Sequence, residues 1–254
     1  MKRAFISLFF FISLASVSVG QSPNQWFKTR WVAPASGTIV FPAMGGGYTL
    51  KYERINPATG AAIGSAATIS GAAAGRVISG LTAGQTYRIY AYGGTFKQIS
   101  FSTYPDNKDD IIAVEQWGAT QWSTMLLAFE RCSKIDVTAT DKPNLSACEV
   151  MSGMFAGCSS LVNANSSITN WATQHIKDMG ELFSGATSFN KPLNWDVINV
   201  KSMSSMFKRA TSFNSTLTFR NMEKVSNMSF MFSEATSFNQ PLNWQMKKIG
   251  RAHV

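Results

Sequence analysis

Apolar residues follow two different spacings along this chain of 254 residues. Between residues 21 and 104, short runs rich in β-branched and aromatic residues alternate with glycine, alanine, proline and serine, a pattern typical of strands joined by turns. From residue 111 onward, one apolar phrase instead returns every 24 to 28 residues. The two patterns predict a multidomain chain, with a β domain followed by a repeat domain.

The first pattern predicts an all-β sandwich over residues 21–104, because seven short strands fit into about 80 residues. The expected strands are 26–32, 37–41, 48–54, 67–70, 76–79, 86–92 and 96–101. Leu81, Gly84 and Tyr87 are spaced as in the tyrosine corner of immunoglobulin-like and fibronectin-III-like sandwiches, which this segment resembles. In that corner the tyrosine hydroxyl bonds back to the chain upstream.

The second pattern forms five registered copies over residues 111–247. The first methionine of each copy is its origin, and position +4 is a phenylalanine in every copy. Positions −3, +3 and +10 are also apolar in every copy, and they include the small residues Ala128 at +3 and Cys148 at −3. The five origins are Met125, Met151, Met179, Met203 and Met228.

The spacing of these positions predicts a short helix in each copy, because −3, 0, +3, +4 and +7 lie on one helical face. Thr124, Ser202 and Asn227 precede an origin and are suited to capping that helix. Leu193 and Trp195 then alternate as in a short strand. A helix followed by a strand is one coil of a leucine-rich-repeat-like α/β solenoid of about 25-residue repeats, in which each coil packs on its neighbours.

The tryptophan, methionine and cysteine residues occupy repeated positions, which favours a role in packing. Trp117, Trp171 and Trp195 recur eight residues before an origin, so core packing is favoured over a sugar-binding platform. Most methionines fill positions 0 and +3 and do not suggest a copper site. Cys132 and Cys158 share position +7, where later copies have alanine; a disulfide between them stays open as an alternative.

Residues 1–20 have the features of a signal peptide that directs export. Lys2 and Arg3 precede an apolar run at 5–14, and small residues permit cleavage before Gln21. The run is too short to span a membrane as a helix, and no later stretch is long enough. We therefore expect a secreted or cell-surface protein without a transmembrane segment.

The net charge of +9 is concentrated in the predicted sandwich. Residues 21–104 hold seven basic residues and one acid, whereas residues 105–254 hold 14 basic and 13 acidic residues. A basic exported domain suits acidic polysaccharide, lipid headgroups or nucleic acid. Because the charges are dispersed along the sequence, solvated strand faces are the simpler interpretation, and no nucleic-acid partner is expected.

No arrangement of catalytic residues is evident, so the sequence predicts no enzyme, no cofactor and no metal site. The chain has two histidines and lacks the usual hydrolase, metalloprotease and phosphate-binding motifs. The aspartates of residues 105–110 lack the glycine and the ligand spacing of a calcium loop. That segment is expected to be a solvated linker between the two domains.

The repeated phrase, Met-x-x-Met-Phe followed by Ala-Thr-Ser-Phe-Asn-x-Pro-Leu-Asn-Trp, resembles the repeats of BspA-like leucine-rich-repeat surface proteins, also found in Mycoplasma-type lipoproteins. The resemblance covers about residues 111–246. It implies a bacterial surface or secreted protein, with adhesion to host, matrix or other cells as the expected role. The preceding domain departs from the Trp-Gly-Asp-Gly motif of many such proteins, since it reads Tyr48-Thr-Leu-Lys-Tyr-Glu-Arg54.

The expected function is therefore non-enzymatic adhesion or protein–protein binding through the solenoid surface. Two alternatives stay open: glycan or matrix binding by the basic sandwich, and an accessory role in a larger secreted hydrolase. The last seven residues, 248–254, break the repeat and are expected to be an artefactual tail of a truncated chain. Exposed basic positions of the repeats are the candidate binding surface: Lys201, Lys208, Arg209 and Lys224.

Overall fold

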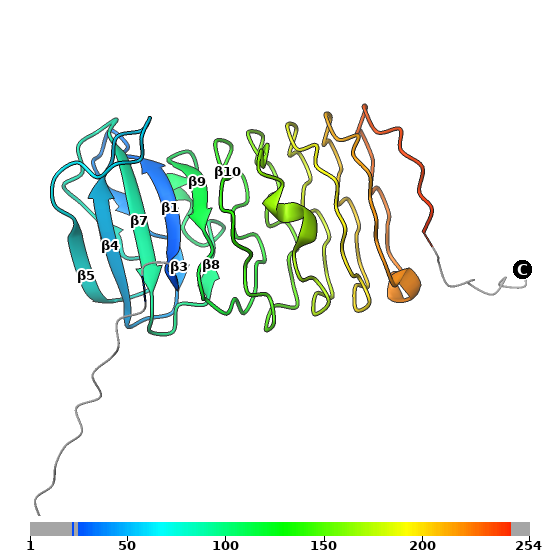
Figure 1. Cartoon of the computed structure of the whole chain (residues 1–254), viewed down its shortest axis with the longest axis horizontal. Coiled ribbons are helices and arrows are strands. Elements are labelled where there is room, and N and C mark those ends of the chain that lie inside the picture. The colour runs from blue at the N-terminus through cyan, green and yellow to red at the C-terminus, as the bar shows by residue number, and fades with distance from the viewer. Residues whose placement is uncertain (1–21, 23–24, 245–254) are drawn as a thin grey trace, which may run out of the picture.

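A computed structural model describes residue 22 and residues 25–244 of the chain. A β-sheet region forms one end of an elongated molecule, and a row of stacked coils extends from it (Figure 1). One continuous hydrophobic core runs from the sheet into the coils. The predicted signal peptide, 1–20, and the predicted tail, 248–254, lie outside the described residues.

The N-terminal region is a mixed β-sheet that contains no α-helix among its described residues. Its main sheet has six strands in the order β10-β9-β1-β7-β4-β5, and only the β9–β10 pair is parallel. The six are β1 (Phe27–Val32), β4 (Tyr48–Arg54), β5 (Ala67–Ala72), β7 (Thr86–Tyr92), β9 (Ile111–Gln116) and β10 (Asp136–Val137). Two small sheets pair β2 (Ile39–Val40) with β6 (Val77–Ile78) and β3 (Ala43–Met44) with β8 (Gln98–Ile99).

Each of the seven expected strands has a counterpart, and the structure adds β3, β9 and β10. The expected tyrosine corner also forms, since the Tyr87 hydroxyl accepts a hydrogen bond of 3.0 Å from the Thr82 N–H. The passage between the two regions is more closely packed than a solvated linker. The short 3₁₀ helix η2 (Pro105–Asn107) ends at a buried Asn107, whose Oδ1 accepts from the Val40 N–H at 2.8 Å.

The coils are built from turns, and the helices predicted at the five origins are wrong. Within residues 25–244 the structure has no α-helix, only 3₁₀ segments at η2, η3 (Ser167–Asn170) and η4 (Met222–Lys224). In the coil that begins at Met203, consecutive turns link the Met206 N–H to the Met203 carbonyl at 3.3 Å and the Ala210 N–H to the Phe207 carbonyl at 3.0 Å. In four of the five coils the side chain before the origin accepts a hydrogen bond from the N–H two positions on, as Ser202 Oγ does from Ser204, so it closes a turn instead of capping a helix.

The remaining N–H groups join each coil to the next. From positions 0, +2, +4 and +6 they donate to the carbonyls of positions −1, +1, +3 and +5 of the following coil. In the coil that begins at Met203, these four bonds have lengths of 2.8 to 2.9 Å, and Phe207 donates to Met231. The same four bonds recur in the coils that begin at Met125, Met151 and Met179. This ladder satisfies the backbone groups that a helix would have satisfied internally.

The backbone reaches this geometry through a left-handed residue at +2 and another at +6 of all five coils. Their φ angles lie between 51° and 74°, although only three of the ten residues are glycines. The ten are Leu127, Gly153, Glu181, Ser205 and Phe230 at +2, and Arg131, Gly157, Gly185, Arg209 and Glu234 at +6. A residue in this region reverses the chain within each turn, which no α-helix permits.

Repeated side chains form columns inside the stack. The +4 rings of neighbouring coils stack 5.6 to 5.9 Å apart, from Phe129 to Phe232. Trp117, Trp171 and Trp195 are buried, so they form no surface platform for sugars. The three cysteines are buried and form no disulfide. The register read from the sequence is therefore confirmed as a packing register, even though the local conformation differs.

Candidate functional site

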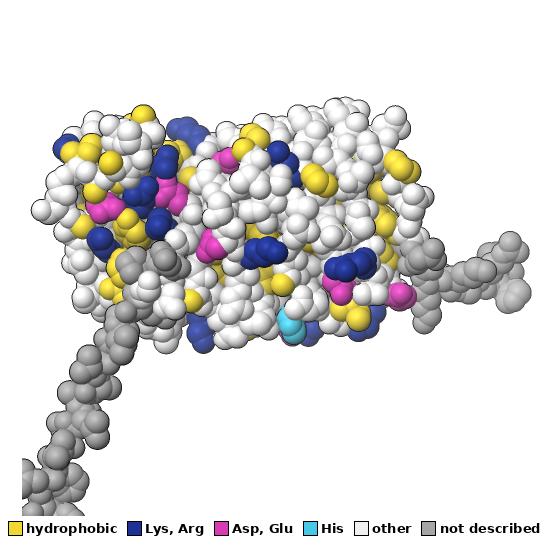
Figure 2. All heavy atoms as spheres, in the orientation of Figure 1, with side chains coloured by type: hydrophobic (Ala, Val, Ile, Leu, Met, Phe, Trp, Pro, Cys, Tyr) yellow, Lys and Arg dark blue, Asp and Glu magenta, His cyan; other side chains and the backbone are white. Residues whose placement is uncertain are grey.

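The outer face of the main sheet gathers charged side chains from four strands, β1, β4, β7 and β9. Strand alternation turns Phe27, Thr29 and Trp31 of β1 into the core and leaves Lys28 and Arg30 outside. Strands β4 and β7 present Lys51, Glu53, Arg88 and Tyr90 on the same face, as their pairing with each other and with β1 requires. Lysine and arginine side chains cluster with carboxylates over this region in Figure 2.

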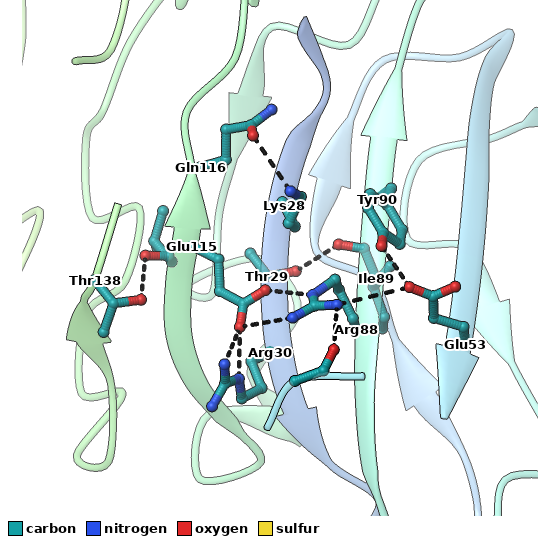
Figure 3. Close-up of polar contacts among 12 residues, drawn as sticks. Lys28, Thr29, Arg30, Glu53, Arg88, Ile89, Tyr90, Glu115, Gln116 and Thr138 are labelled. Atoms are coloured by element: carbon teal, nitrogen blue, oxygen red, sulfur yellow. Dashed lines mark hydrogen bonds and ion pairs between the residues drawn. The ribbon is translucent and has the colours of Figure 1, made fainter. Parts of the chain in front are cut away.

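Glu115 of β9 is the centre of the charge cluster (Figure 3). Its carboxylate accepts from Arg30 Nε at 2.6 Å and from Arg88 Nε at 2.5 Å. Arg30 and Arg88 lie directly opposite each other on β1 and β7. Two like charges in that position destabilise a sheet unless an anion lies between them, and Glu115 is that anion.

A second carboxylate, Glu53, extends the cluster across β4. Its Oε1 lies 3.7 Å from Arg88 Nη1 and accepts from the Tyr90 hydroxyl at 2.5 Å. Arg88 Nη1 also donates to the Gly60 carbonyl at 2.9 Å. Lys51 Nζ is 3.9 Å from Glu53, which is a loose ion pair. Arg88 is thus fixed by three partners, whereas Lys51 is held weakly.

The burial and charge of this face shift several pKa values. Burial opposes the charge on Glu115, but Arg88 and Arg30 outweigh it and lower the pKa of that carboxyl. Burial and the bond to Glu53 raise the pKa of Tyr90 to about 12. Burial and the nearby Arg88 lower the pKa of Lys28. Each carboxylate is committed to arginine, so neither is suited to general acid or base catalysis.

Aromatic rings border the cations on the same face. Trp26 stacks on Tyr92 with centroids 4.4 Å apart and meets Tyr90 edge-on at 5.6 Å. Lys51 Nζ lies 5.1 Å from the Tyr90 ring centroid and Lys28 Nζ lies 5.6 Å from it. Four cations, two carboxylates and three rings together make a surface suited to an anionic ligand.

The four basic residues nominated from the repeats lie on the coil stack. Arg209 pairs with Glu234 at 2.9 Å, and Lys224 Nζ donates to Asn199 Oδ1 at 2.7 Å. Lys201 and Lys224 lie shortly before an origin methionine in the sequence, whereas Lys208 and Arg209 lie shortly after one.

The charge cluster on the sheet was missed because its members are far apart in the sequence. Glu53 and Glu115 are separated by more than 60 residues, and Glu115 falls within the predicted repeat domain. Strand alternation was the one indication of the cluster in the sequence, because residues two apart in a strand lie on the same face. Three pairs have this spacing: Lys28 and Arg30, Lys51 and Glu53, and Arg88 and Tyr90. Among the described residues, no group of three or more histidine, cysteine, aspartate or glutamate side chains is placed to hold a metal ion.

Comparison with known proteins finds a family model that matches the repeat region. Residues 123–245 match the family described as "Mycoplasma protein of unknown function, DUF285". The matched residues include the five origins from Met125 to Met228, so the repeat region is similar to this family, and the β-sheet region precedes the match. No curated protein and no solved structure gives a significant match to the chain. Across the described part of the chain, no helix has the length and apolar character needed to cross a membrane.

Proposed function

We propose that this protein is an exported, non-enzymatic binding protein that mediates adhesion or protein–protein contact at a cell surface. Its coil stack is a leucine-rich-repeat-like solenoid of the BspA-like type, built on turns. The observation that carries the proposal is the division of each coil. Repeated apolar positions are buried, while positions such as +5 and +6 differ from coil to coil and are at least partly exposed.

This division suits recognition and not chemistry. Side chains at 0, +3 and +4 of the four coils that begin between Met125 and Met203 are buried to within 1 %. Their packing leaves the exposed positions free to vary without changing the fold. Lys201, Lys208, Arg209 and Lys224 belong to that variable surface, and no single pair among them dominates it. Affinity is therefore expected to be distributed over several coils.

The β-sheet region is proposed to be an immunoglobulin-like or fibronectin-III-like sandwich that closes the N-terminal end of the solenoid. The bond between the Tyr87 hydroxyl and the Thr82 N–H supports this assignment. Strand β9 pairs antiparallel with β1 and parallel with β10, so the sheet passes directly into the first coil. A fragment that ends at residue 104 would lack β9, so experiments require the full chain.

A second candidate function is binding of an acidic glycan by the outer face of the sheet. The stacked Trp26 and Tyr92 and the flanking Lys28 and Lys51 favour it. Lys51 has only a loose ion pair with Glu53, so a sulfate or carboxylate group on a polysaccharide has a cation to bind.

One experiment separates the two candidates. The full chain is tested for binding to immobilised matrix proteins and for retention on heparin, as wild type, as Lys201→Glu/Lys224→Glu, and as Lys28→Gln/Lys51→Gln. Adhesion through the coils predicts that the first double variant binds the matrix proteins more weakly than wild type and that the second binds them as wild type does. Glycan binding predicts that only the second elutes from heparin at lower salt. Wild-type protein that binds neither surface contradicts both candidates.

A further inference from the structure

A cavity of about 250 Å³ lies where strand β4 ends and strand β7 begins. Residues of β4, of the β4–β5 connection, of β5 and of the first turns of β7 line it, among them Tyr52, Arg54, Ser65, Ala67, Thr82 and Tyr87. Ser65 and Thr82 are exposed, so the cavity is open to solvent. Ligand cavities in proteins usually measure about 300–1,000 Å³, so this cavity suits a small ligand.

Arg54 is a charged residue on the core side of the main sheet. It lies directly opposite Tyr87 of β7, just as Tyr52 lies opposite the fully buried Ile89. Directly paired residues share a face of the sheet, so Tyr52 and Arg54 lie on the side of the core. An arginine on that side is unusual, because arginine is rarely buried without a partner.

The Arg54 guanidinium has no partner within the described part of the chain. Its side chain makes no hydrogen bond and no ion pair to another described residue. Glu53 also lines the cavity, but its carboxylate bonds Arg88 and Tyr90 on the outer face (Figure 3). Residues 55–75 carry no charged side chain. Arg54 is thus a partly buried cation that no carboxylate neutralises, which favours an anion beside it.

Three hydroxyl groups belong to residues that line the same cavity, those of Tyr52, Ser65 and Thr82. In the part of the chain that the structure describes, none of the three hydroxyls makes a hydrogen bond to another residue. They are therefore available to a ligand that itself carries hydroxyl groups. The Tyr87 hydroxyl, in contrast, already accepts from the Thr82 N–H.

Hydrogen bonds hold the walls of the cavity in place. The Ile63 N–H donates to the Arg54 carbonyl at 2.8 Å, which fixes the chain after β4. Arg88 Nη1 holds the same connection through the Gly60 carbonyl at 2.9 Å. The bond of 3.0 Å between Thr82 and Tyr87 fixes the turn before β7. A cavity with preformed walls loses less conformational freedom when a ligand binds.

We propose that this cavity binds a small sugar acid, with the Arg54 guanidinium on its carboxylate and the three hydroxyls on its ring hydroxyls. A guanidinium presents two parallel N–H groups that match a carboxylate. The cavity lies on the core side of the sheet, whereas Lys28 and Lys51 lie on the outer face. The inference is therefore independent of both candidate functions proposed above.

The test titrates the full-length, isotope-labelled protein with glucuronate and, as the neutral counterpart, with glucose. Amide shifts in NMR spectra report both the affinity and the place of binding. We expect glucuronate to bind about tenfold or more tightly than glucose, with the shifts centred on Arg54, Ser65 and Thr82.

Two variants of the cavity test the contacts separately. Arg54→Gln removes the charge and should weaken glucuronate binding about tenfold or more. Ala67→Leu keeps every charge but narrows the cavity, so it should weaken binding about fivefold or more. Amide spectra of both variants without ligand show that the fold is intact.

Two control variants change charges elsewhere. Arg220→Gln removes the same charge from an exposed position on the coil stack, and Lys28→Gln/Lys51→Gln changes the outer face of the sheet. Both should bind glucuronate as the wild type does. The inference is overturned if glucuronate binds no more tightly than glucose, if folded Arg54→Gln binds glucuronate as the wild type does, or if the shifts centre on the outer face.

Discussion

Arg30 of β1 and Arg88 of β7 lie directly opposite each other in the sheet, and both guanidinium groups bond the carboxylate of Glu115. The like-charged pair is stable only while that carboxylate is ionised. Because Glu115 comes from β9, just before the first coil, the same contact fastens the sheet to the coil stack. The charge cluster is therefore a structural joint as well as a candidate ligand surface.

Glu115→Gln should lower the free energy of unfolding by about 2 kcal/mol at neutral pH, because two charged hydrogen bonds lose their anion. The pKa of Glu115 in the folded protein lies below its ordinary value of 4.5. Glu115 therefore contributes fully to the free energy of unfolding when the pH is above its ordinary pKa. That contribution is lost as the pH falls through the lower pKa that Glu115 has in the folded protein. Denaturant unfolding across the acid range should show the wild type and the variant converging.

The matched control for that experiment is Glu149→Gln. Glu149 forms an ion pair with Lys177 at 2.6 Å, but both side chains are at least half exposed. Its replacement should change the free energy of unfolding by no more than about 0.5 kcal/mol at neutral pH. Equal effects of the two substitutions would contradict the central position given to Glu115.

Phe207→Ala should destabilise the protein by about 3–5 kcal/mol. The ring is fully buried and lies between Phe183 and Phe232 in the +4 column. The neighbouring Lys208→Ala should cost within about 0.5 kcal/mol, because that side chain is outside the core. Thermal melting of both variants provides the comparison, and equal melting temperatures would refute the packing register.

Ser205 has a φ of 54°, in the region that disfavours branched side chains. Ser205→Val should therefore lower the free energy of unfolding by about 1–2 kcal/mol. Ser205→Gly should raise it by about 0.5 kcal/mol, because relief of strain exceeds the added entropy of the unfolded chain. A helix at this position would reverse the order, since glycine is the poorer helix former.

The three cysteines should be unreactive in the native protein. Burial raises the pKa of Cys148 to about 11 and also raises the pKa values of Cys132 and Cys158. A thiol reagent at about pH 8 meets little thiolate under those conditions. All three thiols should react once the protein is unfolded in denaturant without reductant. Fewer than three would indicate a disulfide and contradict the free cysteines of the structure.

Much of the fold was predictable from the sequence, because the residues that must be buried are apolar and recur at the same positions of each repeat. The positions of Met203, Phe207 and Ala210 in the core follow from spacing. The backbone conformation between these positions could not be derived from the spacing. Residues three or four apart lie on the same side of an α-helix, but they also lie close together in a series of four-residue turns. Gly153, Gly157 and Gly185, at the left-handed positions, were the signal against a helix; serine, glutamate and arginine at those positions in other coils obscured it.

The candidate site was less predictable than the fold. Strand alternation shows which charges share a face, but it does not show which strands are neighbours. Glu115 meets Arg30 only because β9 pairs with β1 across more than 80 residues of sequence. The break in the pattern at residues 105–110 suggested a boundary at that point. The strand with which β9 pairs is determined by tertiary contacts, and no local propensity of its residues determines it.

The most direct test of the account is a measurement of which carbonyl accepts the hydrogen bond of the Phe207 N–H. The coil ladder places the Met231 carbonyl there, at 2.9 Å, in the next coil. A helix would place the carbonyl of Met203, four residues earlier, at that position. NMR scalar coupling across the hydrogen bond distinguishes the two. We predict a coupling from the Phe207 nitrogen to the Met231 carbonyl carbon, and a coupling to the Met203 carbonyl carbon would contradict the account.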